Sequence, residues 1–136
     1  PEVGRRHRDH LVEKSMASSL TATGLGPWLR ERGIDTLTVV GYMTHNCDDA
    51  TVRQAMHEGW KVELLHDAAG SLPYANSLGT ATAEEIHRVF TIVMHTGFAA
   101  VVSTGEWLKA LASGEALEAD NVFLSNQRAL AGRGTP

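Results

Sequence analysis

The sequence predicts an α/β fold in which a doubly wound, Rossmann-like parallel sheet carries helices on both faces. Two observations favour this class. Short apolar runs alternate with longer amphipathic stretches along the 136 residues, which is the pattern of parallel strands joined by crossover helices. The strongest apolar run, residues 36–41, is rich in β-branched side chains and nearly unbroken, as expected of a strand buried on both faces. No repeat or linker divides the chain, so we expect a single domain over residues 1–136.

The N-terminal part of the chain predicts one clear helix. Residues 1–8 are polar and basic without periodicity, and residues 10–13 form an apolar run that favours a brief strand. The small polar side chains of residues 15–23 are typical of a loop. Apolar residues then recur at helical spacing over residues 25–29, and Gly33 follows cations, so we expect a helix that ends there.

Two strand–helix units occupy the middle of the chain. After the strand at 36–41, a turn leads to a helix over residues 48–59, whose acidic first turn suits the helix dipole. A second strand spans residues 61–65, and a loop rich in small residues follows over 66–78. Residues 82–97 form an amphipathic helix that opens with the pattern Thr-x-x-Glu, typical of a capped start.

The C-terminal part predicts one more strand and a short helix. Residues 98–102 form the strand and residues 106–111 the helix. The last residues, 126–136, end in glycine and proline, and we expect them to form a mobile tail.

Composition excludes several classes of protein. Hydrophobic residues make up 43% and charged residues 21%, close to ordinary globular usage, which argues against disorder and coiled coils. The net charge of −4 gives no basic footprint for nucleic acid. No apolar run approaches the roughly 18 residues of a membrane span, so no membrane partner is expected. A single cysteine excludes an internal disulfide and fits a reducing compartment, so we expect a cytoplasmic protein.

That single cysteine, Cys47, is the main candidate for chemistry. It lies six residues after Gly41, at the carboxyl end of the strongest strand and just before a helix. Ligands gather at such strand ends, and a helix N-terminus favours a thiolate and can hold an oxyanion. His45 is a possible base, whereas Asp48 and Asp49 would disfavour a thiolate if they faced it. The alternative is that Cys47 is a small buried apolar residue without a catalytic role.

Four segments carry a family resemblance. Residues 39–55, which include Gly-Tyr-Met-Thr-His-Asn-Cys and a following helix with Thr and Ala, resemble the nucleophile turn of the isochorismatase-like cysteine hydrolases. Residues 14–25 resemble the family's lysine segment, in which Lys-Ser precedes Thr-x-Leu. Residues 59–68 and 101–104 resemble the next strand and a late strand end, so the match runs from about residue 9 to residue 108.

The resemblance implies a doubly wound fold and an activity. The implied reaction is hydrolysis of the C–N bond of a small amide or lactam through a covalent thioester, by a triad of Cys, Lys and Asp. Cys47 would be the nucleophile, and Lys14 would hydrogen-bond the carboxylate and stabilise the thiolate. The backbone N–H groups of Met43 and Cys47 would form the oxyanion hole, and the peptide bond between Tyr42 and Met43 would be cis.

Four side chains are candidates for lining the substrate pocket: Tyr42, Thr44, His45 and Tyr74. Core packing is an equal alternative for Tyr42. His7 and His10 lie close together, but no matching downstream pair completes a metal site, so we expect no metal and no other cofactor.

The sequence departs from the family pattern in its acids. The implied catalytic Asp ends a first strand, but only 13 residues precede Lys14, whereas a strand with its crossover takes about 30 or more. Asp9 lies just before the lysine segment and is not assigned as the base. We therefore expect an N-terminally incomplete domain, with its first strand and catalytic Asp upstream of Pro1. Such a chain alone would hydrolyse no small amide. Asp48 replaces a usual apolar residue, and it either caps the helix or favours a cationic substrate.

A different class of function stays open. The absent Asp would also fit a non-catalytic or degenerate family member that binds a small molecule or a protein partner. Within the family, the cysteine turn looks more like the bacterial cysteine hydrolases that include streptothricin lactam hydrolases than like nicotinamidases. The resemblance also implies a homo-oligomer, a dimer or tetramer. The sequence does not indicate which amide is the substrate.

Overall fold

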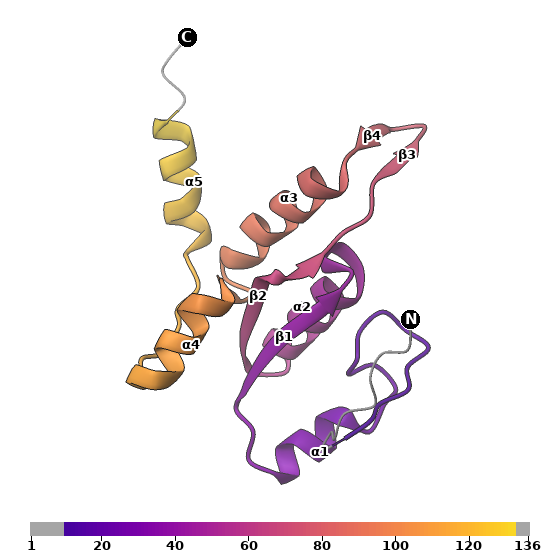
Figure 1. Cartoon of the computed structure of the whole chain (residues 1–136), viewed down its shortest axis with the longest axis vertical. Coiled ribbons are helices and arrows are strands. Elements are labelled where there is room, and N and C mark those ends of the chain that lie inside the picture. The colour runs from indigo at the N-terminus through magenta and orange to yellow at the C-terminus, as the bar shows by residue number, and fades with distance from the viewer. Residues whose placement is uncertain (1–9, 133–136) are drawn as a thin grey trace.

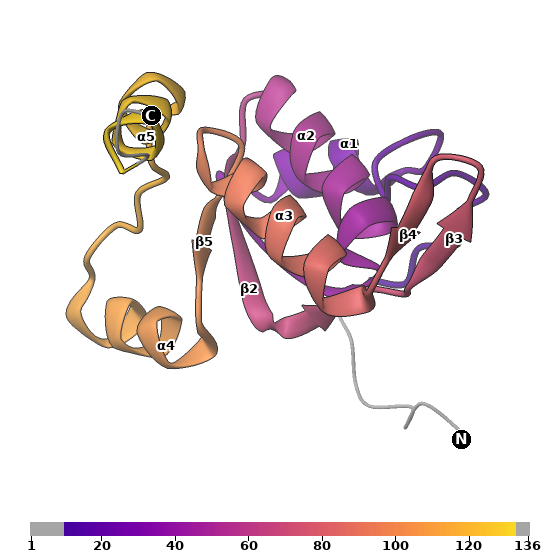
Figure 2. The ribbon, with the colours of Figure 1, turned by 90° about the horizontal axis from the view of Figure 1, so that it is seen from above.

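The computed structural model describes residues 10–132 of the chain. Three parallel strands form its sheet, a hairpin lies apart from it, and α2 and α3 lie on one side of the sheet with α4 on the other (Figures 1 and 2). The predicted α/β class with a parallel sheet between helices is confirmed. The elements in chain order are α1 (Leu25–Glu31), β1 (Thr36–Tyr42), the π-helical turn η1 (Thr44–Asp48), α2 (Asp49–His57), β2 (Lys61–Gly70), β3 (Tyr74–Asn76), β4 (Gly79–Ala81), α3 (Ala83–His95), β5 (Ala100–Val102), α4 (Thr104–Ser113) and α5 (Val122–Ala131).

Parallel pairing brings the carboxyl ends of the strands to one edge of the sheet. The strand order is β1-β2-β5, with Thr36 of β1 opposite Lys61 of β2. Near the end of β1 the register shifts, so that Gly41 pairs with Ala69. Among the strands described in residues 10–132, β1 pairs with β2 alone. The chain leaves β1 at the carboxyl edge and enters η1 there, which places Cys47 at this edge.

The core lies between the sheet and the helices α1, α2 and α3. Its fully buried side chains include Val52 of α2, Leu64 of β2 and Met94 of α3. Burying a side chain of this size stabilises a fold by about 1.5–3 kcal/mol, so α2 is firmly held against the sheet. On the opposite face α4 covers β2, where the Trp107 indole N–H donates to Glu63 at 2.9 Å. The sheet thus positions α2, the helix that follows the candidate nucleophile.

Two helices begin with reciprocal caps. The Thr82 side chain accepts from the Glu85 N–H at 3.1 Å, and the Glu85 carboxylate accepts from the Thr82 N–H at 2.8 Å, so the predicted start of α3 is confirmed. Ser103 and Glu106 form the same arrangement at α4. Because Ser103 caps it, α4 begins at Thr104 and not at Glu106 as we expected.

Three expectations for the part of the chain before α3 need correction. The apolar run at residues 10–13 pairs with no described strand and forms none itself. Strand β2 continues to Gly70 instead of ending near residue 65, because the small residues Ala69 and Gly70 still pair with β1 through their backbones. Residues 74–81 then form the β3–β4 hairpin, most of which falls within residues 66–78, where we expected a loop.

The C-terminal residues also differ from expectation. Part of the expected mobile tail is helical, since residues 126–131 complete α5, whereas residues 133–136 lie outside the described residues. The Asn121 side chain explains this helix, because it accepts from the N–H groups of Phe123 and Leu124 at 2.9 and 3.1 Å. α5 stands away from the sheet (Figure 1), and none of its residues is buried.

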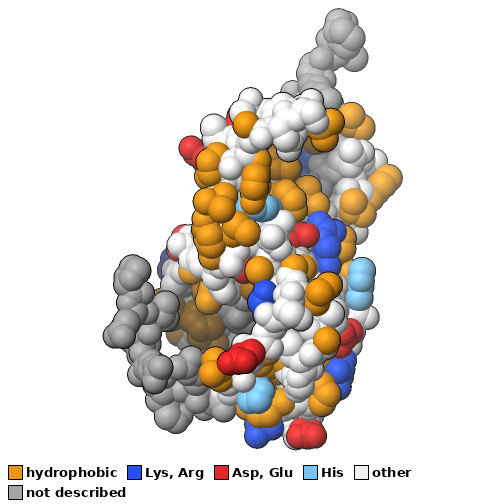
Figure 3. Space-filling view, turned by 90° about the vertical axis from the view of Figure 1, so that its right-hand side faces the viewer, with side chains coloured by type: hydrophobic (Ala, Val, Ile, Leu, Met, Phe, Trp, Pro, Cys, Tyr) orange, Lys and Arg blue, Asp and Glu red, His pale blue; other side chains and the backbone are white. Residues whose placement is uncertain are grey.

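Exposed apolar side chains are numerous near that end of the molecule. Hydrophobic side chains gather in the upper half of the face shown in Figure 3, the height at which Figure 1 places α3 and α5. The exposed apolar residues on these two helices are Val89, Ile92, Val93, Val122, Phe123, Leu124 and Leu130.

No helix within residues 10–132 is both long enough and apolar enough to cross a bilayer.

Candidate active site

Cys47 lies in η1, the tight turn between β1 and α2. The Met43 carbonyl accepts from the N–H groups of Asn46 at 3.0 Å and Asp48 at 3.2 Å, which closes the turn. The peptide bond between Tyr42 and Met43 is cis. Cys47 is a free, half-buried thiol two residues before the first residue of α2. The turn therefore presents the sulfur at the carboxyl edge of the sheet, where parallel folds place their ligands.

Lys14 meets Cys47 from a segment 33 residues away in the sequence. Its ammonium donates to Cys47 Sγ at 3.2 Å, to the Met16 carbonyl at 3.0 Å and to the Ala17 carbonyl at 2.9 Å. An ammonium has three N–H groups and no acceptor, so all three are used and the sulfur must accept. A cation donating to a cysteine sulfur favours the thiolate. Within residues 10–132 no carboxylate bonds to Lys14, although the resemblance implied one.

Helix α2 holds the lysine segment and the cysteine turn together. The Thr51 hydroxyl donates to the Cys47 carbonyl at 2.7 Å and accepts from the Ser19 N–H at 3.0 Å. One turn later, Thr21 donates to the Gln54 side chain at 2.7 Å. Neither Thr51 nor Gln54 stood out in the sequence beyond the family's helix pattern. These two polar side chains lie four and seven residues after Cys47, one turn apart, and this spacing gains meaning only when the segment that they contact is known.

His45 and Tyr74, both candidates for the substrate pocket, lie in contact. His45 Nε2 lies 2.8 Å from the Tyr74 hydroxyl, and His45 Nδ1 lies 3.1 Å from the Ser71 hydroxyl. The ring of Phe90 approaches His45 edge-on, with centroids 6.0 Å apart. Because Tyr74 belongs to β3, these contacts fasten the exposed hairpin beside the cysteine turn. Ser71 and Phe90 were not among the predicted residues, since neither carries a motif of its own.

The other two pocket candidates occupy opposite environments. Thr44 is fully buried, donates to the Gly70 carbonyl at 2.9 Å and lies 2.8 Å from His87 Nδ1. It therefore braces the turn instead of lining an open pocket. Tyr42 is 57% exposed, so it is not part of the core that residues 10–132 form. His87 was missed because a lone histidine in an amphipathic helix gives no signal in the sequence.

Asp48 is a buried acid directly beside the candidate nucleophile. It is 4% exposed, its Oδ2 has no partner within residues 10–132, and it makes no capping bond to α2. Burial raises the pKa of the Asp48 carboxyl above its ordinary range, while the charges of His45, His87 and Lys14 act in the opposite direction. The capping role considered for this residue is thus not seen.

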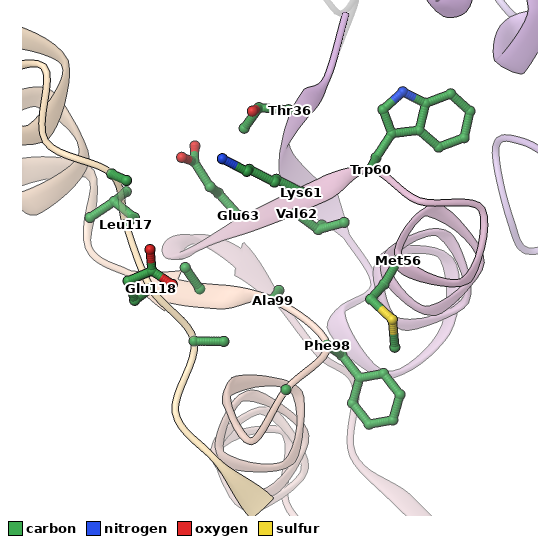
Figure 4. Close-up of a pocket in the computed structure, with 14 residues that line it drawn as sticks. Thr36, Met56, Trp60, Lys61, Val62, Glu63, Phe98, Ala99, Leu117 and Glu118 are labelled. Atoms are coloured by element: carbon green, nitrogen blue, oxygen red, sulfur yellow. The ribbon is translucent and has the colours of Figure 1, made fainter.

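Two cavities within the described residues lie away from the sulfur. One of about 280 Å³ opens at the amino ends of the strands, between the sheet and the segment before α5, where Trp60, Phe98 and Glu118 line it (Figure 4). Another, of about 350 Å³, lies between the hairpin and the start of α3 and reaches Tyr74. Residues 10–132 hold no group of three or more side chains suited to a metal ion.

Comparisons with known proteins agree with this architecture. A family model described as the isochorismatase domain matches residues 1–106. A proposed isochorismatase from Burkholderia xenovorans LB400 has a crystal structure that superposes with a TM-score of 0.94 and is 57% identical in sequence. That likeness covers 98% of this chain and 64% of the Burkholderia chain.

Two curated relatives are more distant. The uncharacterised isochorismatase family protein YddQ of Bacillus subtilis is 31% identical over 102 residues, which cover 75% of this chain and 57% of YddQ. Nicotinamidase 3 of Arabidopsis thaliana is 28% identical over 103 residues, which cover 76% of this chain and 47% of the plant protein. The chain thus spans about half the length of these relatives.

Proposed function

The chain belongs to the isochorismatase family, and we propose that it supplies the nucleophile of a cysteine hydrolase that cleaves the C–N bond of a small amide or lactam. The observation that carries this proposal is the 3.2 Å hydrogen bond from Lys14 Nζ to Cys47 Sγ. It pairs the chain's single thiol with a cation at the carboxyl edge of the sheet. Amide hydrolysis within the family, which the name of the Arabidopsis relative reflects, supports the general reaction class.

The proposed acylation begins with attack of the Cys47 thiolate on the carbonyl carbon. A C–S bond forms, the carbonyl electrons move to oxygen, and the backbone N–H groups of Met43 and Cys47 are proposed to donate to that oxygen. When the tetrahedral intermediate collapses, the C–N bond breaks and an acid gives its proton to the leaving nitrogen. The product of this half-reaction is a thioester on Cys47.

The second half-reaction releases the acid product. The group that gave its proton now takes one from water, and the water oxygen attacks the thioester carbonyl. The C–S bond breaks, the carboxylic acid leaves, and the thiolate returns to its place beside Lys14. Lys14 stays protonated throughout and stabilises the departing sulfur.

We propose that the proton-carrying acid lies outside residues 10–132. No carboxylate in that range hydrogen-bonds to Lys14 or to Cys47, and this includes the carboxylate of Asp48. The edge of β1 that has no described partner supports this proposal, because a further parallel strand there would end beside η1. The substrate pocket is proposed to include His45 and Tyr74, which face one another beside the turn.

An activated ester tests the nucleophile without the acid, because the leaving group of such an ester departs without a proton. We expect p-nitrophenyl acetate to acetylate the 136-residue chain once, at its only cysteine. The same chain should not turn over nicotinamide, whose leaving nitrogen needs a proton. Mass spectrometry locates the acetyl group, and absorbance follows p-nitrophenolate.

The variant Cys47→Ala is the matched control for this experiment. Acetylation that persists in Cys47→Ala, or that is absent from the parent chain, would contradict the proposal that Cys47 is the nucleophile. Either result would favour a family member that only binds a small molecule. Turnover of nicotinamide that persists when Glu2 and Asp9 are changed to Gln and Asn would contradict the proposal that the acid lies outside residues 10–132.

The role of Lys14 is tested by labelling the same thiol. In Lys14→Met the ammonium is lost, and iodoacetamide should label Cys47 about tenfold more slowly at neutral pH, because the sulfur loses the cation that hydrogen-bonds to it. Lys109→Met removes an exposed lysine of α4 and should label at the parent rate. Equal rates in all three chains would show that Lys14 does not activate the thiol.

A further inference from the structure

Thr44 is the fixed point of the turn that carries Cys47. It follows Met43, whose carbonyl closes η1, and its side chain is fully buried. Its hydroxyl makes two contacts, at 2.9 Å to the Gly70 carbonyl and at 2.8 Å to His87 Nδ1. The turn is therefore tied at one atom to the end of β2 and to helix α3.

The number of protons decides which group donates in each contact. A carbonyl oxygen cannot donate, so the single hydroxyl proton of Thr44 must lie on the Gly70 contact. Thr44 can then only accept from His87, which requires a proton on Nδ1 of that ring. Both the neutral Nδ1–H tautomer and the doubly protonated ring carry this proton, so the contact is kept in either charge state.

We propose that His87 is a positioning residue for the Cys47 turn, acting through Thr44. This inference rests on the proposed function, in which the turn carries the nucleophile and the oxyanion donors. The Nδ1–H of His87 fixes the Thr44 hydroxyl, and the hydroxyl fixes the backbone from Met43 to Cys47 against β2 and α3. A donor at the position of Nδ1 is what the site requires, and a donor at the position of Nε2 does not replace it.

Two amide side chains discriminate between these positions. In His87→Asn the side-chain NH₂ lies near the place of Nδ1, whereas in His87→Gln it reaches the place of Nε2. Hydrogen exchange of the Asn46 and Asp48 amides reports on the turn, since both donate to the Met43 carbonyl. We expect exchange at these two amides to rise about tenfold in His87→Gln and to stay within about threefold of the parent in His87→Asn.

A neighbouring residue on the same helix gives the control. Arg88→Gln changes an exposed side chain of α3 and should leave exchange in the turn unchanged. The pair Thr44→Val and Thr44→Ser serves if His87→Gln does not fold, because Val removes the hydroxyl and Ser keeps it. Loss of protection in Thr44→Val with retention in Thr44→Ser supports the same link.

Acetylation by p-nitrophenyl acetate gives the chemical readout. His87→Gln should slow acetylation of Cys47, and His87→Asn should restore it. The proposal is overturned if Asn and Gln behave alike, if neither changes the turn, or if His87→Gln raises exchange equally throughout β2, which would mark a general structural role. Exchange is measured without any reaction, so failure of the proposed hydrolase function would not be mistaken for failure of this inference.

Discussion

Lys14 uses all three of its N–H donors in the candidate site, one of them on the Cys47 sulfur. Two of its three N–H groups are fixed by the carbonyls of Met16 and Ala17, at 3.0 and 2.9 Å, so the third is aimed at the sulfur by the backbone of its own loop. Ordering a lysine costs side-chain entropy, and here three bonds offset that cost. A carboxylate that joined Lys14 would have to displace or share one of these bonds, which makes the lysine loop a sensitive part of the candidate site.

Asp48 places a buried acid beside the same turn, where Lys14 provides a cation. A buried carboxylate with an unpartnered oxygen is costly, and burial raises the pKa of Asp48 above its ordinary value of about 3.9. The folded chain therefore binds more protons than the unfolded chain between these two pKa values. It follows that this group makes the free energy of unfolding fall as pH rises upward from about 3.9.

The variant Asp48→Asn tests the direction of this pH dependence of stability. It removes the ionisable group, so its stability relative to the parent should increase from about pH 4 to about pH 7. Chemical denaturation of both chains at the two pH values measures the difference. A difference that does not change with pH would show that Asp48 titrates normally in the folded chain.

The residues of the site were predictable to different degrees. Cys47 and Lys14 carry motifs with fixed spacing, so the sequence pointed to both and the structure brings them together. His87 and Thr51 act through contacts that join segments 43 and 32 residues apart, and a single sequence holds no signal for such pairs. Asp48 was visible as an acid at an unusual position, but its burial depends on tertiary packing.

At the scale of the element, the capped start of α3 positions His87. The Glu85 carboxylate accepts from the backbone and side chain of Thr82, and these bonds lower the pKa of Glu85. Its contribution to stability is therefore present above the unfolded pKa and is lost as pH falls through the folded one. This sign is opposite to that of Asp48.

Two variants test the cap. Thr82→Ala should destabilise the chain by about 0.5–2 kcal/mol, as removal of a helix cap does. Glu85→Gln should destabilise it at neutral pH, and the loss should shrink as the pH falls below about 4. Glu84→Gln changes an acid of the same helical turn without touching the cap and should cost less at neutral pH. Denaturation curves check all three, and an equal loss in Glu84→Gln would argue against the cap.

Elements with strong local patterns were predicted well, and elements that depend on pairing were not. Strand β1 follows from an unbroken run of β-branched residues and helix α3 from apolar periodicity, both of which a window of sequence contains. The expected burial of β1 on both faces is wrong, since none of its residues is buried in the part of the chain that the structure describes. The end of β2 does not follow from such a window, because Ala69 and Gly70 have no strand preference and join the sheet only through their pairing with β1. Helix α5 depends on one capping side chain, Asn121, in an otherwise weak pattern.

At the scale of the whole molecule, the candidate nucleophile and one of the cavities lie at opposite ends of the strands. The carboxyl edge of the sheet carries Cys47 and Lys14, whereas the cavity of about 280 Å³ opens at the amino ends of the strands (Figure 4). Beyond that end stands α5, which leaves the domain after Asp120 (Figure 1). The homo-oligomer implied by the family resemblance stays a prediction. Removal of α5 is a way to test whether this helix takes part in such an oligomer.

Removing α5 should hardly change the stability of an isolated chain. No α5 residue is buried, and the segment before it is tied to the domain by a hydrogen bond from the Asp120 N–H to the His95 carbonyl, at 2.7 Å. For a chain that ends at Ala119 we expect a thermal midpoint within about 3 °C of the parent, because less than about 1 kcal/mol is lost. In contrast, Met94→Ala empties a fully buried site and should cost about 2–5 kcal/mol.

Circular dichroism gives the midpoints, and light scattering gives the mass of each chain. If truncation lowers the midpoint by as much as Met94→Ala and also reduces the mass from a multiple of the chain to a single copy, then α5 is buried against another copy and the isolated-chain argument fails.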